Sequence, residues 1–136
     1  MHIDEITGTL LGSVSRTFAL SIRVLPAGLR DPMAIAYLLA RTSDTIADSA
    51  DIATALRLER LDDFIALLEA GVDSTRIAGI QADIRPAAPG EQRLIAALPG
   101  VLAHYERLPP RDRAETRGLL ATITAGQRND LVAFRD

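Results

Sequence analysis

Apolar residues recur at helical spacing along almost the whole chain, and this periodicity constrains the fold more than any other feature. The stretch "DIATALRLERLDDFIALLEAG" is typical, with apolar residues every three or four positions. No stretch alternates polar and apolar residues with the β-branched enrichment expected of a strand. The chain is therefore predicted to be all-α. Short connections between the helices favour an antiparallel helical bundle.

Capping and breaking residues divide this pattern into helices. Ser13 or Ser15 fits the N-cap of the second helix, and Pro32 fits the first turn of the third. Asp51 and Gly71 fit the two ends of the fourth helix. The predicted helices cover residues 3–12, 15–24, 32–48, 51–71, 74–84, 91–107 and 110–136. The last has no Gly, Asn or Pro stop signal, so the sequence reads as though it ends within a helix.

Length, charge and composition exclude several classes of protein. The 136 residues suit one helical unit, and a net charge of −3 argues against nucleic-acid binding, which needs a basic face. With no cysteine there is neither a disulfide framework nor a thiolate metal site, which fits a cytoplasmic location. The N-terminus lacks the pattern of a signal peptide, and no apolar run approaches the length that spans a bilayer. We therefore expect a soluble chain with at most peripheral membrane contact.

The predicted third helix carries a polar stripe. Tyr37, Arg41, Asp44 and Asp48 follow one another at intervals of three or four residues, so they share a face, whereas the other faces are apolar. Because the run "MAIAYLLA" predicts burial on more than one side, the two stacked carboxylates are expected to be buried and to need a cation. Their hard oxygen ligands favour Mg²⁺ beside a diphosphate. The alternative is a solvent-facing stripe in which Arg41 pairs with Asp44.

Two long segments resemble a known family. Residues 13–49, "SVSRTFALSIRVLPAGLRDPMAIAYLLARTSDTIADS", closely resemble the N-terminal segment of the squalene/phytoene synthase family. In that family Ser-x-x-Phe precedes a helix with Tyr, Arg and the first Asp-rich motif. Residues 108–134, "LPPRDRAETRGLLATITAGQRNDLVAF", resemble the family segment that carries another Asp, matched by Asp130. The resemblance covers nearly the whole chain and corresponds to the N-terminal portion of the family.

The resemblance implies the isoprenoid synthase fold and a prenyltransferase that joins two prenyl diphosphates head to head with release of diphosphate. It implies that Asp44 and Asp48 hold Mg²⁺ against the donor diphosphate. Arg41 would orient the aspartates or contact phosphate oxygens. Tyr37 would line the apolar cavity, where an aromatic face stabilises the allylic cation.

Four further residues are assigned to substrate binding by the same resemblance. Ser15 and Arg16 would bind diphosphate, and Phe18 would line the cavity. Asp130 would be a further acid at the pocket, either on a metal or steering an arginine. Each has an ordinary structural alternative: Phe18 as core, Arg16 as a surface charge and Asp130 as an exposed helix residue.

The chain also departs from the family. Family members carry a second Asp-rich motif on a later helix, which these residues lack; Asp62 and Asp63 instead read as the solvated face of an amphipathic helix. The chain is therefore expected to hold one side of an active site, exposing an apolar groove that leads to self-association or to binding of a C-terminal half.

The residues of the matched segments favour a squalene synthase-like protein acting on farnesyl diphosphate, with NADPH required if squalene is the product. A phytoene synthase-like protein acting on geranylgeranyl diphosphate and a non-catalytic helical interaction module are the alternatives. A chain-elongating prenyltransferase or a terpene cyclase would show a denser Asp-Asp-x-x-Asp motif, which is absent from the sequence.

Overall fold

The computed structural model describes residues 1–133, and these form helices and connections without a strand. The prediction of an all-α fold is confirmed. In chain order the elements are the π-helix η1 (Glu5–Leu10), α1 (Leu11–Val14), α2 (Arg16–Ile22), α3 (Ala27–Ala47), α4 (Thr54–Ala70), α5 (Ser74–Asp83), α6 (Pro89–Ala96), α7 (Leu98–Glu106) and α8 (Pro110–Ala133).

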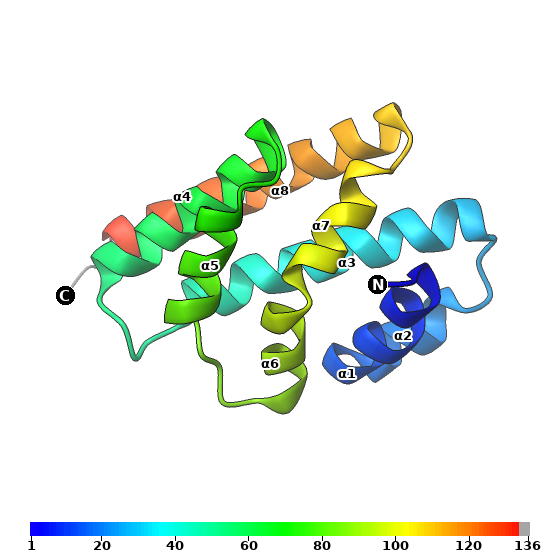
Figure 1. Ribbon diagram of the computed structural model, residues 1–136, viewed down its shortest axis with the longest axis horizontal. Helices are drawn as coiled ribbons and strands as arrows, with labels where there is room; N and C mark the ends of the chain where they lie inside the picture. The colour runs from blue at the N-terminus through cyan, green and yellow to red at the C-terminus, as the bar shows by residue number, and fades with distance from the viewer. Residues whose placement is uncertain (134–136) are drawn as a thin grey trace.

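The central element is α3, which contacts η1, α2, α4, α6, α7 and α8. Figure 1 shows it crossing the middle of the molecule, with the N-terminal helices and α6 on one side and α4 and α8 on the other. Its apolar residues Ile35, Leu38, Leu39 and Ile46 are buried almost completely. The prediction that this helix is buried on more than one side is therefore correct for its apolar faces.

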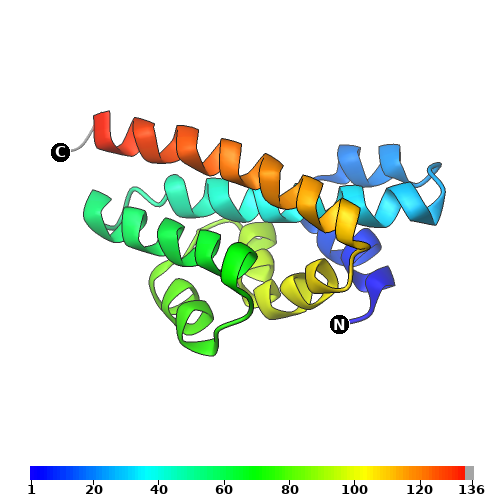
Figure 2. The same cartoon turned by 90° about the horizontal axis from the view of Figure 1, so that it is seen from above.

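The three long helices α3, α4 and α8 lie side by side (Figure 2). Helix α4 runs antiparallel to α3, as expected for neighbours joined by a short connection. Helix α8 runs in the same direction as α3, because α5, α6 and α7 turn the chain between them. The ends of α3 and α8 consequently lie at the same end of the molecule.

The start of α3 differs from the prediction. The helix begins at Ala27, and Pro32 lies inside it rather than in its first turn. Pro32 has no N–H to donate to the carbonyl of Gly28, but Gly28 is exposed, so water can satisfy that carbonyl. An exposed first turn therefore lets the helix continue through a residue that usually ends one.

The predicted helix over residues 91–107 is two helices. Helix α6 ends at Ala96, and α7 starts at Leu98 after a break at Ala97. Pro99 causes the break, because it cannot donate to the carbonyl of Ile95. That carbonyl instead accepts a hydrogen bond from Nε2 of Gln81 on α5 (3.1 Å).

Three helix ends involve residues that the sequence predicts to cap or stop a helix. Ser15 is the N-cap of α2, as predicted, since its hydroxyl accepts a hydrogen bond from the backbone N–H of Phe18 (3.2 Å). Gly71 follows α4 with a φ of 103°, as a glycine stop requires. Asp51 does not cap α4, because the helix starts at Thr54 with Ala53 at its N-cap.

The two acids of α4 differ from each other. Asp62 is exposed, as predicted for a solvated face, and forms an ion pair with Arg128 of α8 (3.0 Å). Asp63 is not on that face: its carboxylate is largely buried and pairs with Arg60 and with Arg76 of α5 (3.2 Å). These ion pairs link α4 to its neighbours.

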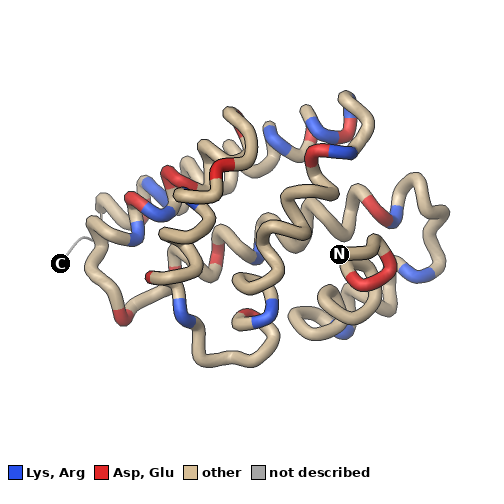
Figure 3. The backbone as a smooth tube through the Cα atoms, viewed as in Figure 1, with Lys and Arg blue, Asp and Glu red and all other residues tan. Residues whose placement is uncertain are grey.

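Surface charge is mixed over the described residues. Figure 3 shows basic and acidic positions interspersed along the backbone, with both signs on α4 and α8. In the described part of the chain, every helix is too short or too polar to cross a membrane.

Candidate functional site

The last turn of α3 places Asp44 and Asp48 at one end of the molecule. The helix ends at Ala47, and Asp48 is its C-cap, with its N–H donating to the carbonyl of Asp44 (2.8 Å). Both aspartates are exposed. The expectation of a buried carboxylate pair is therefore wrong, because the pair lies where α3 leaves the core.

The position of the pair is nevertheless unfavourable for two anions. The C-terminal end of a helix carries a partial negative charge, which favours cations there, and the last turn of α3 has no basic residue. The pKa of Asp44 is raised above its ordinary value of 3.8 by loss of water around the carboxyl and then by the negative charge of Asp48. Arg41 and a hydrogen bond from Gln127 act in the opposite direction. A bound cation would relieve this repulsion.

Arg41 lies on the polar stripe, one turn before Asp44. Its Nη2 donates to Oε1 of Glu91 on α6 (3.2 Å), so the ion pair that it forms is with Glu91 and not with Asp44. Its Nε is buried and has no hydrogen-bond partner among the described residues. The guanidinium thus joins α3 to α6 beside the aspartates.

Tyr37 begins the stripe and stacks on Phe18 of α2. The ring centroids lie 4.4 Å apart, with 13° between the ring planes. Both rings are half-buried and pack against the hydrophobic core. The two predicted cavity residues therefore form one aromatic pair, which leaves part of each ring uncovered.

Ser15 and Arg16 lie at the start of α2. The hydroxyl oxygen of Ser15 is occupied in capping this helix, and Arg16 is exposed. Among the described residues, no hydrogen bond or ion pair links either of them to Arg41 or to the aspartates. Their assignment to diphosphate binding stays a prediction.

Asp130 lies on α8, across from the end of α3. It lines a hollow of about 400 Å³ together with Asp48, Arg57 and Gln127. The structure therefore brings together Asp48 and Asp130, which are 82 residues apart in the sequence, at the end of the molecule where α3 and α8 both finish.

Gln127 and Arg57 are components of this region that the sequence analysis did not identify. Nε2 of Gln127 donates to Oδ1 of Asp44 (2.6 Å). Arg57 donates from Nη1 to the carbonyl of Ala47 (3.3 Å) and from Nη2 to Oγ1 of Thr54 (3.1 Å), so it binds the C-terminal end of α3. The spacing of three residues between Gln127 and Asp130 is a sequence signal for a shared helix face, whereas nothing near Arg57 in the sequence indicates its position.

Three buried polar atoms without a hydrogen-bond partner occur in the described part of the chain. They are Nε of Arg41, Nε of Arg57 and Oε1 of Gln127, and all three side chains surround the aspartate pair. An unpaired buried polar group costs about 1–3 kcal/mol. Their concentration here is what a site completed by a polar ligand would show.

The two carboxylates at the end of α3 fit Mg²⁺, which keeps water and phosphate ligands, better than a metal whose ligands all come from the protein. Within residues 1–133, no group of three or more His, Asp or Glu side chains is placed to hold a metal. His2 and His104 likewise form no zinc site there. Mg²⁺ is commonly bound by one or two carboxylates together with water and substrate phosphates, and Asp44 and Asp48 are two carboxylates that would suit this role.

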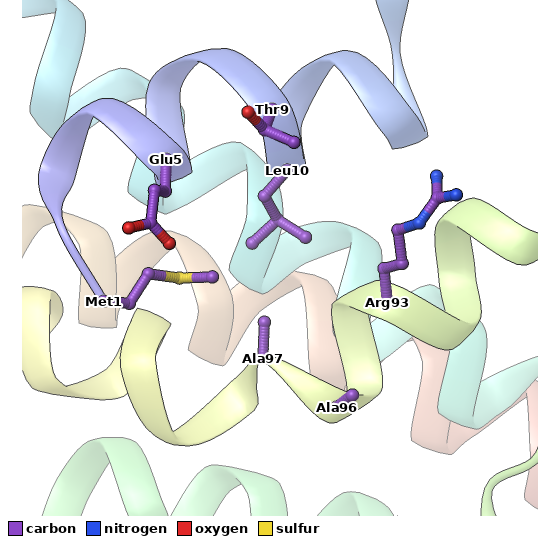
Figure 4. A pocket seen from close by; sticks show the side chains of 7 residues that line it. All are labelled: Met1, Glu5, Thr9, Leu10, Arg93, Ala96 and Ala97. Carbon is purple, nitrogen blue, oxygen red and sulfur yellow. The ribbon is translucent and has the colours of Figure 1, made fainter.

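A second hollow, of about 600 Å³, lies between η1 and the α6–α7 junction. Figure 4 shows Leu10 in its middle, with Met1 and Glu5 on one side and Arg93 on the other. Although it is larger than the hollow at Asp48, its one acid and one base do not form a paired carboxylate site. We therefore place the candidate site at the end of α3.

Comparison with known proteins identifies the family. The family model described as squalene/phytoene synthase matches residues 11–135. The chain belongs to the squalene/phytoene synthase family. No solved structure matches it significantly.

Several squalene synthases are similar to this member of the family. Squalene synthase BSS from Botryococcus braunii is 34% identical over 125 residues, which cover 92% of this chain and 24% of that protein. Squalene synthases from Nicotiana benthamiana and Solanum lycopersicum are 43% and 44% identical over 56 and 55 residues, or 41% and 40% of this chain and 14% and 13% of theirs. The chain thus spans about a quarter of the length of the first of these relatives.

The raised pKa of Asp44 predicts how stability depends on pH. Since folding favours the neutral carboxyl, its stabilising effect is complete below the unfolded pKa near 3.8 and is lost as the pH rises through the higher folded pKa. Without divalent cations, Asp44→Asn should therefore melt roughly 1–3 °C above the wild type at pH 7, and this difference should vanish toward pH 4.

Thermal melts between pH 4 and 8 followed by circular dichroism make this comparison. Asp51→Asn, which changes an exposed acid in the α3–α4 connection, is the matched control and should follow the wild type. An Asp44→Asn variant that is less stable than the wild type at pH 7 would contradict the electrostatic description of the pair.

Proposed function

We propose that these residues form one side of the active site of a head-to-head prenyl synthase, which joins two molecules of farnesyl diphosphate with release of diphosphate. The observation that carries the proposal is that Asp44 in the last turn of α3 and Asp48 at its C-cap lie at the same end of the molecule as Asp130, which shares one hollow with Asp48. The squalene synthases among its relatives support farnesyl diphosphate as the substrate.

In this proposal Asp44 and Asp48 are the residues that would hold Mg²⁺ beside the donor diphosphate. Bound Mg²⁺ supplies Lewis-acid neutralisation of the leaving diphosphate. Arg41, held by Glu91, keeps a positive charge beside the pair, and Asp130 supplies a further acid in the hollow. Ser15 and Arg16 contribute to diphosphate binding.

Tyr37 and Phe18 supply the apolar side of the site. Their stacked rings are partly uncovered, and an aromatic face can stabilise positive charge on an allylic group. Aromatic side chains also exclude water, which would otherwise capture such a cation. The prenyl chains are accordingly placed along the α2–α3 side of the molecule.

Formation of squalene would also require NADPH as the hydride donor. A phytoene-type reaction on geranylgeranyl diphosphate is the second candidate, because the family model covers both kinds of synthase. It would use the same aspartates and end in proton loss.

The proposed reaction needs residues beyond these 136, since the match that covers 92% of this chain covers only 24% of Squalene synthase BSS. We assign the additional residues to a C-terminal half with the second Asp-rich motif, in the same or in another polypeptide. Four exposed apolar side chains on and around α2 and the first half of α3 support a covering partner; they are Leu20, Val24, Leu29 and Met33.

The first prediction from this proposal concerns activity. The 136-residue chain alone, given farnesyl or geranylgeranyl diphosphate, Mg²⁺ and NADPH, should make no hydrocarbon, because nothing positions the second substrate. Adding the part of Squalene synthase BSS that the match does not cover should restore product. Asp44→Ala or Asp48→Ala should then lower the rate at least about 10³-fold, since the metal supplies several kcal/mol.

Chromatography of the hydrocarbon extract measures the product and separates squalene from phytoene. Asp51→Ala is the control and should leave the restored rate unchanged. Product made by the isolated chain, or full activity of Asp44→Ala in the restored mixture, would contradict the proposal.

The second prediction concerns the exposed apolar side chains. Without a C-terminal half, the chain should self-associate and bind a hydrophobic dye. Leu29→Glu should reduce both, whereas Leu119→Glu, a change at a similarly exposed leucine of α8, should reduce them less. Sedimentation velocity with dye fluorescence tests this. A compact wild-type monomer that binds no dye would show that these side chains need no partner.

A further inference from the structure

Gln127 makes a hydrogen bond that joins the end of α8 to the candidate metal site. Its Nε2 donates to Oδ1 of Asp44 at 2.6 Å, across 83 residues of sequence. Helices α3 and α8 run side by side in the same direction (Figure 2), so the contact lies where both are close to their ends. Gln127 also lines the hollow that contains Asp48 and Asp130.

A role in packing alone does not explain a glutamine at this position. Its Oε1 is buried and has no hydrogen-bond partner among the described residues, which costs about 1–3 kcal/mol. Methionine has nearly the same length and shape and would fill the space without this cost. The amide must therefore contribute through the hydrogen bond that it does make.

That hydrogen bond fixes an otherwise mobile group. The carboxylate of an exposed aspartate turns readily about its terminal torsion, which has broad minima. A donor held on a second helix limits this rotation and leaves the other carboxylate oxygen of Asp44 unoccupied by Gln127. Groups that orient metal ligands in this way typically change metal affinity 10- to 100-fold.

We propose that Gln127 is a positioning residue, which holds the carboxylate of Asp44 in the orientation that binds a divalent cation. This inference rests on the proposed function, because it takes Asp44 as a metal ligand. It adds a dependence that the aspartates alone do not have: cation binding at the end of α3 depends on the position of α8. Gln127 need not touch the substrate or the cation.

Titration of the 136-residue chain with Mn²⁺ tests the proposal. Binding is measured as the loss of the electron paramagnetic resonance signal of unbound Mn²⁺. Gln127→Met should weaken binding about 10-fold or more without lowering the melting temperature in the absence of metal. Gln81→Met is the matched control: Gln81 is also half-buried and donates across helices, but to Ile95 and Ala96, away from the aspartates. It should bind Mn²⁺ like the wild type.

The outcomes separate this inference from the proposed function. Gln127→Met that binds Mn²⁺ as tightly as the wild type, while Asp44→Asn binds it weakly, would overturn the role of Gln127 and leave the metal site intact. A wild-type chain that binds no Mn²⁺, or Asp44→Asn that binds it normally, would overturn the metal site and this inference with it.

A second measurement examines the hydrogen bond without metal. In ¹⁵N-edited NMR spectra, Asp44→Ala should shift the side-chain amide signals of Gln127, because their acceptor is lost, and leave those of Gln81 in place. Amide signals of Gln127 that do not move in Asp44→Ala would overturn the proposal even where the Mn²⁺ affinities agree with it.

Discussion

The packing of α3 against its neighbours is the interaction on which the rest of the structure depends. Leu38, Leu39 and Ile46 are among its fully buried side chains, and burial of each contributes about 1.5–3 kcal/mol. Because helices from both ends of the chain pack on α3, its axis is fixed along its length. The polar residues on its last turns therefore have defined positions although they lie at the surface, as a metal site requires.

The end of α3 combines several unfavourable features, of which a cation would offset the carboxylate repulsion and an anionic ligand would accept from the unpaired arginine N–H groups. Asp44 and Asp48 repel each other at the negative end of a helix, and three unpaired polar atoms lie around them. On α4, by contrast, Asp62 pairs with Arg128 and Asp63 with Arg76. The contrast indicates that stability is lost locally where the proposed function requires it.

Sequence periodicity was sufficient to predict the helices and the shared face of Asp44 and Asp48, because both depend on local spacing. It failed where a distant group decides the outcome. At the break before α7, Gln81 of α5 donates a hydrogen bond to the carbonyl of Ile95. Asp63 of α4 forms an ion pair with Arg76 of α5. Gln127 and Arg57 were missed for the same reason, since their contacts with the end of α3 exist only after the helices pack.

We propose that the two aspartates at the end of α3 form a divalent-cation site. Crystals of this chain soaked in Mn²⁺ and inorganic diphosphate, with data collected at the manganese edge, test it most directly. We expect an anomalous peak within bonding distance of carboxylate oxygens of both Asp44 and Asp48, with diphosphate beside it. Manganese bound elsewhere, with both carboxylates free of metal, would contradict it.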